Sequence, residues 1–109
     1  MTENTFRNFA EIATKELAPG FTATPIHTGN NTINFVDIKA GSTLALHQHP
    51  HEQYSFVLEG EFEMTIGDEK QVLNTSKFAL IPSNVRHGGT AITDCRVLDI
   101  FYPVREDYR

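Results

Sequence analysis

The chain of 109 residues contains one cysteine, no long apolar run and no cluster of basic residues. A single cysteine, Cys95, cannot form an internal disulfide, so nothing in the sequence indicates an oxidising compartment. No segment approaches the roughly 20 apolar residues that a membrane-spanning helix needs. The first residues also lack the basic start and apolar stretch of a signal peptide, and we therefore expect a cytoplasmic protein. A formal net charge of −5 argues against a nucleic-acid partner.

The length and composition are those of one ordinary globular domain. Hydrophobic residues make up 39% of the chain and charged residues 21%, as in soluble proteins. There is no linker, no low-complexity segment and no internal repeat. We therefore expect residues 1–109 to form a single domain whose core needs no disulfide.

One segment has a helical pattern. Apolar residues within 5–17 recur at intervals of three or four, which predicts a short N-terminal helix. These residues are Phe6, Phe9, Ile12, Ala13 and Leu17. Pro19 and Gly20 then predict that the helix has ended.

The rest of the chain predicts strands and turns. The segments with strand character are 32–38, 42–49, 53–60, 61–67, 77–82 and 94–103. Glycine, proline or asparagine separates them at spacings of about 8 to 12 residues, which is typical of a β-sandwich or β-barrel. The last strand is apolar at both alternating sets of positions, so it is either buried on both faces or packed against a partner chain.

Histidines provide the first functional signal. His47 and His49 are two residues apart, so on a strand they point the same way, as two ligands of one metal ion must. His51 is expected to lie beyond the end of that strand and is not counted as a ligand. His87 is distant in sequence, but the turn residues before it could return it to the same place. The alternative is a set of exposed or hydrogen-bonded histidines without a metal.

The spacing of these residues closely resembles the two motifs of the cupin superfamily. Residues 41–60 match the first motif, which is glycine, H-x-H, glutamate and glycine, and residues 76–91 match the second, which is proline, glycine and histidine. Gln53 stands at the glutamate position and Asn84 at a glycine position. The resemblance implies an all-β fold, the double-stranded β-helix barrel, with one metal ion inside its mouth. It also implies a set of four ligands, namely His47, His49, Gln53 and His87.

Three imidazoles and one amide oxygen suit a divalent transition metal, and the ligand set does not choose among Zn²⁺, Ni²⁺, Fe²⁺, Co²⁺ and Mn²⁺. Gln53 in place of glutamate removes one negative charge, so the metal would keep its full dipositive charge. Such a centre favours an anionic ligand.

The C-terminal strand carries the second functional signal. Asp99 and Phe101 share one strand face; if that face lines the barrel, apolar surroundings would raise the pKa of Asp99, as suits an acid/base group. The alternative is a buried aspartate that accepts hydrogen bonds from backbone N–H groups. Arg105 could fold over the barrel mouth and hold a carboxylate through two hydrogen bonds, or it could be an exposed tail residue. Tyr102 could reach the site or could serve only in packing.

Together, "HPHEQ", "VLEGE", "IPSNVRHG" and the terminal "DIFYPVREDY" are similar to the KdgF-type cupins of pectin and alginate breakdown. These convert 4,5-unsaturated monouronates to linear ketonised forms. The resemblance implies Asp99 and Arg105 as catalytic residues and Phe101 and Arg105 as substrate contacts, with Tyr102 as a further candidate. The expected partners are a small anionic sugar acid and a second copy of the chain. The alternative functions are a sugar-acid-binding module without catalysis and another metal cupin enzyme, such as a dioxygenase or a lyase.

Overall fold

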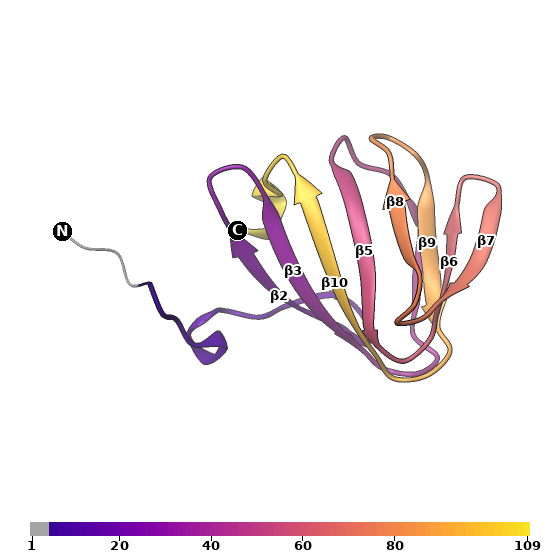
Figure 1. The fold of residues 1–109 in the computed structure, drawn as a ribbon, viewed down its shortest axis with the longest axis horizontal. Coiled ribbons are helices and arrows are strands. Elements are labelled where there is room, and N and C mark those ends of the chain that lie inside the picture. The colour runs from indigo at the N-terminus through magenta and orange to yellow at the C-terminus, as the bar shows by residue number, and fades with distance from the viewer. Residues whose placement is uncertain (1–4) are drawn as a thin grey trace.

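The computed structural model describes residues 5–109, which form two antiparallel sheets (Figure 1). The six-stranded sheet has the order β1 (Lys15–Ala18), β2 (Phe21–His27), β3 (Thr32–Ile38), β10 (Cys95–Tyr102), β5 (Glu52–Glu59) and β8 (Phe78–Ile81). The four-stranded sheet has the order β4 (Thr43–His47), β9 (His87–Ala91), β6 (Phe62–Ile66) and β7 (Glu69–Leu73). The prediction of an all-β fold is therefore confirmed.

The core lies between the two sheets because the strands alternate. In β3, Val36 and Ile38 are buried while Asp37 between them is exposed. The other large members of this core are Phe21, Val57, Phe62, Met64, Leu73, Ile81 and Val97. At the turn after β5, Gly60 has a φ of 88°, and a Cβ there would overlap the carbonyl oxygen of Asp94. This turn thus requires glycine.

The predicted N-terminal helix is wrong. Within 5–17 there is only a single 3-10 turn, η1 (Phe9–Glu11), and the segment ends in β1, which pairs with β2. The apolar residues do not form one buried face: Phe6 is 95% exposed, whereas Phe9 packs edge-on against Phe35 with ring centroids 5.3 Å apart. A short helix with no face to bury is marginal in water, and strand pairing replaces it.

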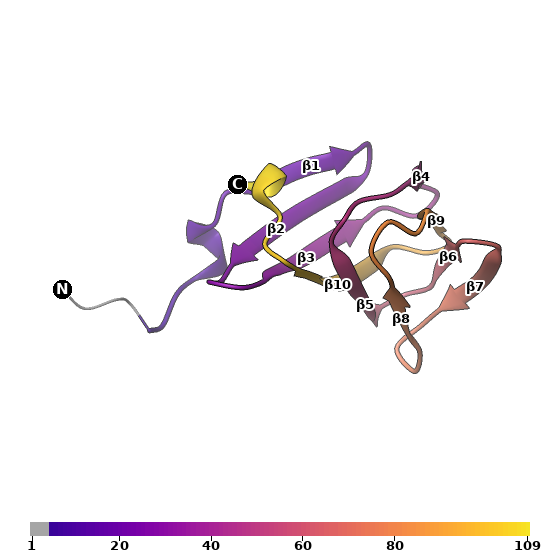
Figure 2. The ribbon, with the colours of Figure 1, turned by 90° about the horizontal axis from the view of Figure 1, so that it is seen from above.

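The two sheets face each other as an open sandwich rather than a closed barrel (Figure 2). Within residues 5–109, no strand of one sheet pairs with a strand of the other. The double-stranded β-helix is therefore present as two separate sheets. The expectation that the strands close into a barrel is wrong. No helix in this part of the chain is long and apolar enough to cross a membrane.

The central position of β10, between β3 and β5, explains why this strand is apolar at both alternating sets of positions. Val97 and Phe101 are buried between the sheets, while Leu98 and Ile100 lie on the outer face and are half-buried. The outer face is thus apolar and is not fully covered by residues 5–109. The expected homodimer stays a prediction.

Candidate metal centre and adjoining pocket

Three histidines come together at one end of the sandwich. His47 ends β4, His87 begins β9, and the two are partners across the four-stranded sheet. His49 follows in the turn toward β5. The ligand atoms of the three side chains all lie within 4.8 Å of one another. His51 is outside this cluster.

Two turns hold His87 against the first motif. Asn84 has a φ of 64°, the left-handed conformation in which asparagine best substitutes for glycine. Its backbone N–H donates to the carbonyl oxygen of His49 over 2.8 Å. Ser83 Oγ donates to the carbonyl oxygen of Pro50 over 2.6 Å. These bonds place the loop before His87 beside the loop that carries His49.

The backbone fixes the tautomer of all three imidazoles. Each Nδ1 lies 2.9 Å from a carbonyl oxygen two residues away: His47 from Ala45, His49 from His51, and His87 from Val85. Because a carbonyl oxygen only accepts, each Nδ1 must be the donor, and the Nε2 lone pairs remain for a metal. This arrangement matches the support that metal-binding histidines usually have.

The electrostatics of the cluster also suit a cation. Burial lowers the pKa of His87 to about 4 and also lowers the pKa of His49, so both imidazoles are neutral near pH 7. The buried Nε2 of His87 has no hydrogen-bond partner among the described residues. A buried nitrogen of this kind normally has a partner, and a metal ion would supply it.

Gln53 on β5 completes the cluster. Its Oε1 lies 3.0 Å from Nε2 of His49. With the His49 proton on Nδ1, both of these atoms carry lone pairs, and they would repel each other unless a cation lay between them. Two ligands at right angles, each about 2.1 Å from a metal, are also about 3 Å apart. The four side chains therefore fit a divalent ion.

Asp99 on β10 is joined to Gln53 through Ser55. Gln53 Nε2 donates to Ser55 Oγ over 2.9 Å, and Ser55 Oγ donates to Asp99 Oδ1 over 2.6 Å. The partner of Asp99 is thus a serine side chain rather than a backbone N–H. Burial raises the pKa of Asp99 to about 6, partly offset by the hydrogen bonds from Ser55 and Gln53 and by the charge of Arg105.

Arg105 is not an exposed tail residue, since only 7% of its surface is exposed. Its guanidinium carbon lies 4.8 Å from the ring centroid of Phe101 and 4.1 Å from that of Tyr108. Nε and Nη2 both donate to the carboxylate of Asp107, over 3.0 and 2.7 Å. Phe101 is itself buried and meets the imidazole of His49 edge-on.

Tyr102 does not reach this site, so its assignment as a substrate contact is corrected. It follows Phe101 on β10 and therefore points to the opposite face of the sheet, where it is 59% exposed. Sequence reasoning missed Ser55, Asp107 and Tyr108. Ser55 is two residues after Gln53 on β5, so both side chains lie on the same strand face. This spacing is the one sequence feature that could have predicted a role for Ser55.

Residues 34–101 match the family model of the cupin domain. The chain belongs to the cupin family. The chain is also 36% identical over 64 residues to the pectin degradation protein KdgF of Dickeya dadantii (strain 3937), which is 57% of this chain and 58% of that protein. This alignment thus spans less than two thirds of that relative.

Solved structures agree with this assignment. The structure of KdgF from Halomonas sp. superposes on the cupin with a TM-score of 0.85 and 30% identity, over 97% of this chain and 98% of that one. An RmlC-like cupin from Shewanella frigidimarina NCIMB 400 gives a TM-score of 0.88 at 24% identity, over 98% and 97% of the two chains. The second match supports the fold alone, while the first confirms the predicted resemblance to KdgF-type cupins.

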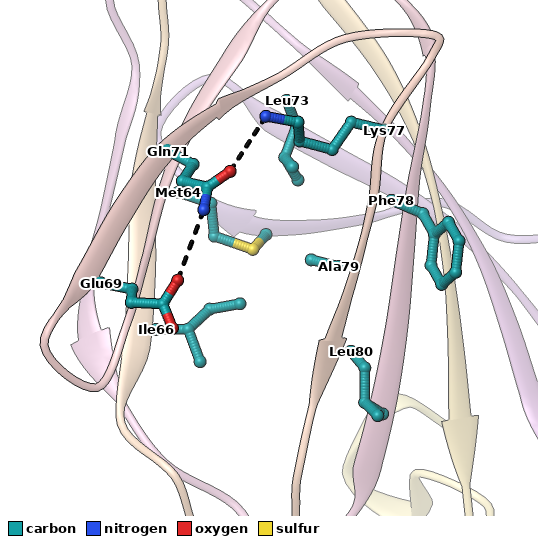
Figure 3. Close-up of a pocket in the computed structure, with 9 residues that line it drawn as sticks. All are labelled: Met64, Ile66, Glu69, Gln71, Leu73, Lys77, Phe78, Ala79 and Leu80. Carbon is teal, nitrogen blue, oxygen red and sulfur yellow. Dashed lines mark hydrogen bonds between the residues drawn. The ribbon is translucent and has the colours of Figure 1, made fainter.

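Two pockets of the cupin differ in chemistry. The first lies between the sheets, and its polar lining is His47, Gln53, His87, Asp99, Arg105 and Tyr108. The second lies between the edge strands β7 and β8 (Figure 3). There Lys77 donates to Gln71 over 2.9 Å and Gln71 to Glu69 over 3.3 Å, so these polar groups satisfy one another. Of these two pockets, the first therefore contains the groups able to act on a ligand.

Proposed function

We propose that this cupin is a metal-dependent enzyme that converts 4,5-unsaturated monouronates from pectin or alginate breakdown to their linear ketonised forms. The observation that carries the proposal is that one pocket brings together two members of a histidine cluster that could hold a metal, His47 and His87, with an aspartate of raised pKa and a buried arginine. The resemblance to KdgF supports the choice of substrate.

His47, His49, Gln53 and His87 would hold the metal. When bound, a divalent ion supplies a Lewis acid that stabilises negative charge developing on a substrate oxygen. None of the four ligands is anionic, so the centre keeps its charge for a substrate carboxylate and enolate. This is the chemical reason to expect a sugar acid rather than a neutral sugar.

The reaction is an isomerisation in which no atom is gained or lost. In the substrate, the C4=C5 double bond adjoins both the ring oxygen and the carboxylate. After the anomeric hydroxyl loses its proton, the bond between C1 and the ring oxygen breaks, which leaves an aldehyde at C1 and an enolate at C5. Protonation at C4 then gives the α-keto acid.

The protein groups have separate roles in these steps. Asp99 moves the proton, as the base toward the anomeric hydroxyl or as the acid toward C4, and a pKa of about 6 lets it do either near neutral pH. Arg105 holds the carboxylate, and the ring of Phe101 packs against the sugar.

The test follows the absorbance of the unsaturated uronate with and without the zinc-loaded protein. We expect the wild-type protein to remove this absorbance faster than the spontaneous reaction does. In Asp99→Asn we expect kcat to fall by about 100-fold or more, which is the usual size of an acid/base contribution. Asp68→Asn removes an exposed turn carboxylate and serves as the matched control. A rate no faster than the spontaneous one overturns the proposal.

The same assay separates the alternatives. A sugar-acid-binding module would bind the uronate without consuming it. A dioxygenase would need a redox-active metal and oxygen. Full turnover with zinc under nitrogen therefore excludes both.

A further inference from the structure

The C-terminal turn η2 (Glu106–Tyr108) follows Arg105 at the chain end and lies beside β1 (Figure 2). Asp107 binds the side edge of the guanidinium, formed by Nε and Nη2, while the ring of Tyr108 lies over its carbon. The turn is tied to β1, because Lys15 Nζ donates to the backbone carbonyl oxygen of Asp107 over 2.9 Å. Arg105 is thus held by groups that the reaction itself does not use.

A guanidinium offers two edges that can bind a carboxylate through two parallel hydrogen bonds. Asp107 occupies the Nε–Nη2 edge of Arg105, so this ion pair does not use the edge between Nη1 and Nη2. The side chain of Asp107 is 57% exposed, whereas Arg105 lines the pocket together with Asp99. Asp107 therefore lies on the solvent side of the guanidinium.

We propose that Asp107 is a positioning residue, which fixes the guanidinium of Arg105 so that its Nη1–Nη2 edge receives the carboxylate of the sugar acid. This inference rests on the proposed function for the substrate class. Arginine has several freely rotating bonds, and ordering it only when the ligand arrives would weaken binding. Asp107 orders it beforehand.

A role of Asp107 through its charge alone and a role in positioning Arg105 predict opposite changes in ligand affinity when the carboxylate is removed. If the carboxylate acted only through its charge, its removal would make the site more positive and an anionic ligand would bind more tightly. If it positions Arg105, its removal lets the guanidinium move and the ligand binds more weakly. The sign of the change in affinity therefore decides between them.

The same turn provides a matched control. Glu106 is also acidic, but its side chain is 75% exposed and pairs with Arg109, over 3.0 Å, rather than lying along the guanidinium of Arg105 as Asp107 does. Glu106→Gln removes the same charge within one residue of Asp107. It reports the effect of charge alone.

The experiment uses the zinc-loaded protein and two readouts, KM and kcat for the unsaturated uronate and calorimetric binding of galacturonate, a saturated monouronate that cannot react. For Asp107→Asn we expect KM and the dissociation constant to rise roughly three- to tenfold, the cost of ordering one long side chain on binding. We expect kcat to stay within about twofold. Glu106→Gln should leave both constants unchanged or slightly lower.

A double-mutant cycle with Arg105→Lys separates positioning from a general effect on the fold. Lysine keeps the charge but lacks the two-edged guanidinium, so Asp107→Asn should add little in that background. Lys15→Met, which frees the turn from β1, should raise KM in the same direction by a smaller factor.

Binding by Asp107→Asn that is equal to or tighter than wild type overturns the inference. An equal loss in the Arg105→Lys background also overturns it. If the wild type binds galacturonate but does not consume the unsaturated uronate, the proposed function fails while the Asp107 comparison can still be made.

Discussion

Ser55→Ala is the most direct test of the bridge between the metal ligand Gln53 and the acid Asp99. Ser55 is 0% exposed, accepts a hydrogen bond from Gln53 and donates one to Asp99. Its loss leaves a buried amide N–H and a half-buried carboxylate each without this partner. A hydrogen bond to a charged group contributes about 1.5–3 kcal/mol and a neutral one about 1 kcal/mol, so we expect the free energy of unfolding to fall by roughly 2–4 kcal/mol.

Ser83 offers a matched control with the same bonding pattern. It accepts from the Asn84 side-chain amide over 3.2 Å and donates to the carbonyl oxygen of Pro50 over 2.6 Å, but it is exposed. Water can replace its hydroxyl, so Ser83→Ala should cost less than about 1 kcal/mol. Urea denaturation at pH 7 measures both variants.

The two variants should also differ in activity. Residues that orient metal ligands typically contribute 10- to 100-fold in affinity or rate, and we expect Ser55→Ala to lose about that much in kcat. The reasoning is wrong if the free energies of unfolding of Ser55→Ala and Ser83→Ala differ by less than about 0.5 kcal/mol and Ser55→Ala keeps its activity. The bridge from Gln53 to Asp99 would then have no energetic importance.

Three further predictions concern the metal, the acid and the outer face. His87→Ala should lose the bound metal in mass-spectrometric metal analysis, whereas His51→Ala should retain it; equal loss in both would contradict the ligand set. In chelator-treated protein, the raised pKa of Asp99 contributes stability that is present below about pH 4 and is lost as the pH rises through about 6. The difference in unfolding free energy between wild type and Asp99→Asn should therefore change across this window, and a constant difference would refute the shift. Ile100→Arg should abolish the predicted homodimer in sedimentation, and a monomeric wild type would exclude that dimer.

The sequence predicted those parts of the site that depend on local spacing. A two-residue repeat on a strand sets the directions of His47 and His49 whatever the rest of the chain does. The parity of β10 likewise put Asp99 and Phe101 on one face. The same rule places Tyr102, which is adjacent to Phe101, on the opposite face of the sheet.

The missed features depend on contacts between segments that are distant in the chain. Lys15 reaches Asp107 from the other end of the sequence, and Ser55 meets Asp99 from a neighbouring strand. Helical spacing within 5–17 could not show that Leu17 belongs to a strand, since that strand forms only against β2. β9 contains two adjacent glycines and has no strand signal of its own.

The three backbone carbonyls that hold the imidazoles make the metal site tolerant of amino-acid substitutions during evolution. Main-chain atoms belong to every residue type, so substitutions around the cluster cannot remove these hydrogen bonds as long as the loops keep their shape. The acid and the arginine, in contrast, come from β10 and the chain end. A lineage could therefore exchange Asp99, Arg105 and their supports, and so acquire a different reaction, while inheriting an unchanged place for the metal.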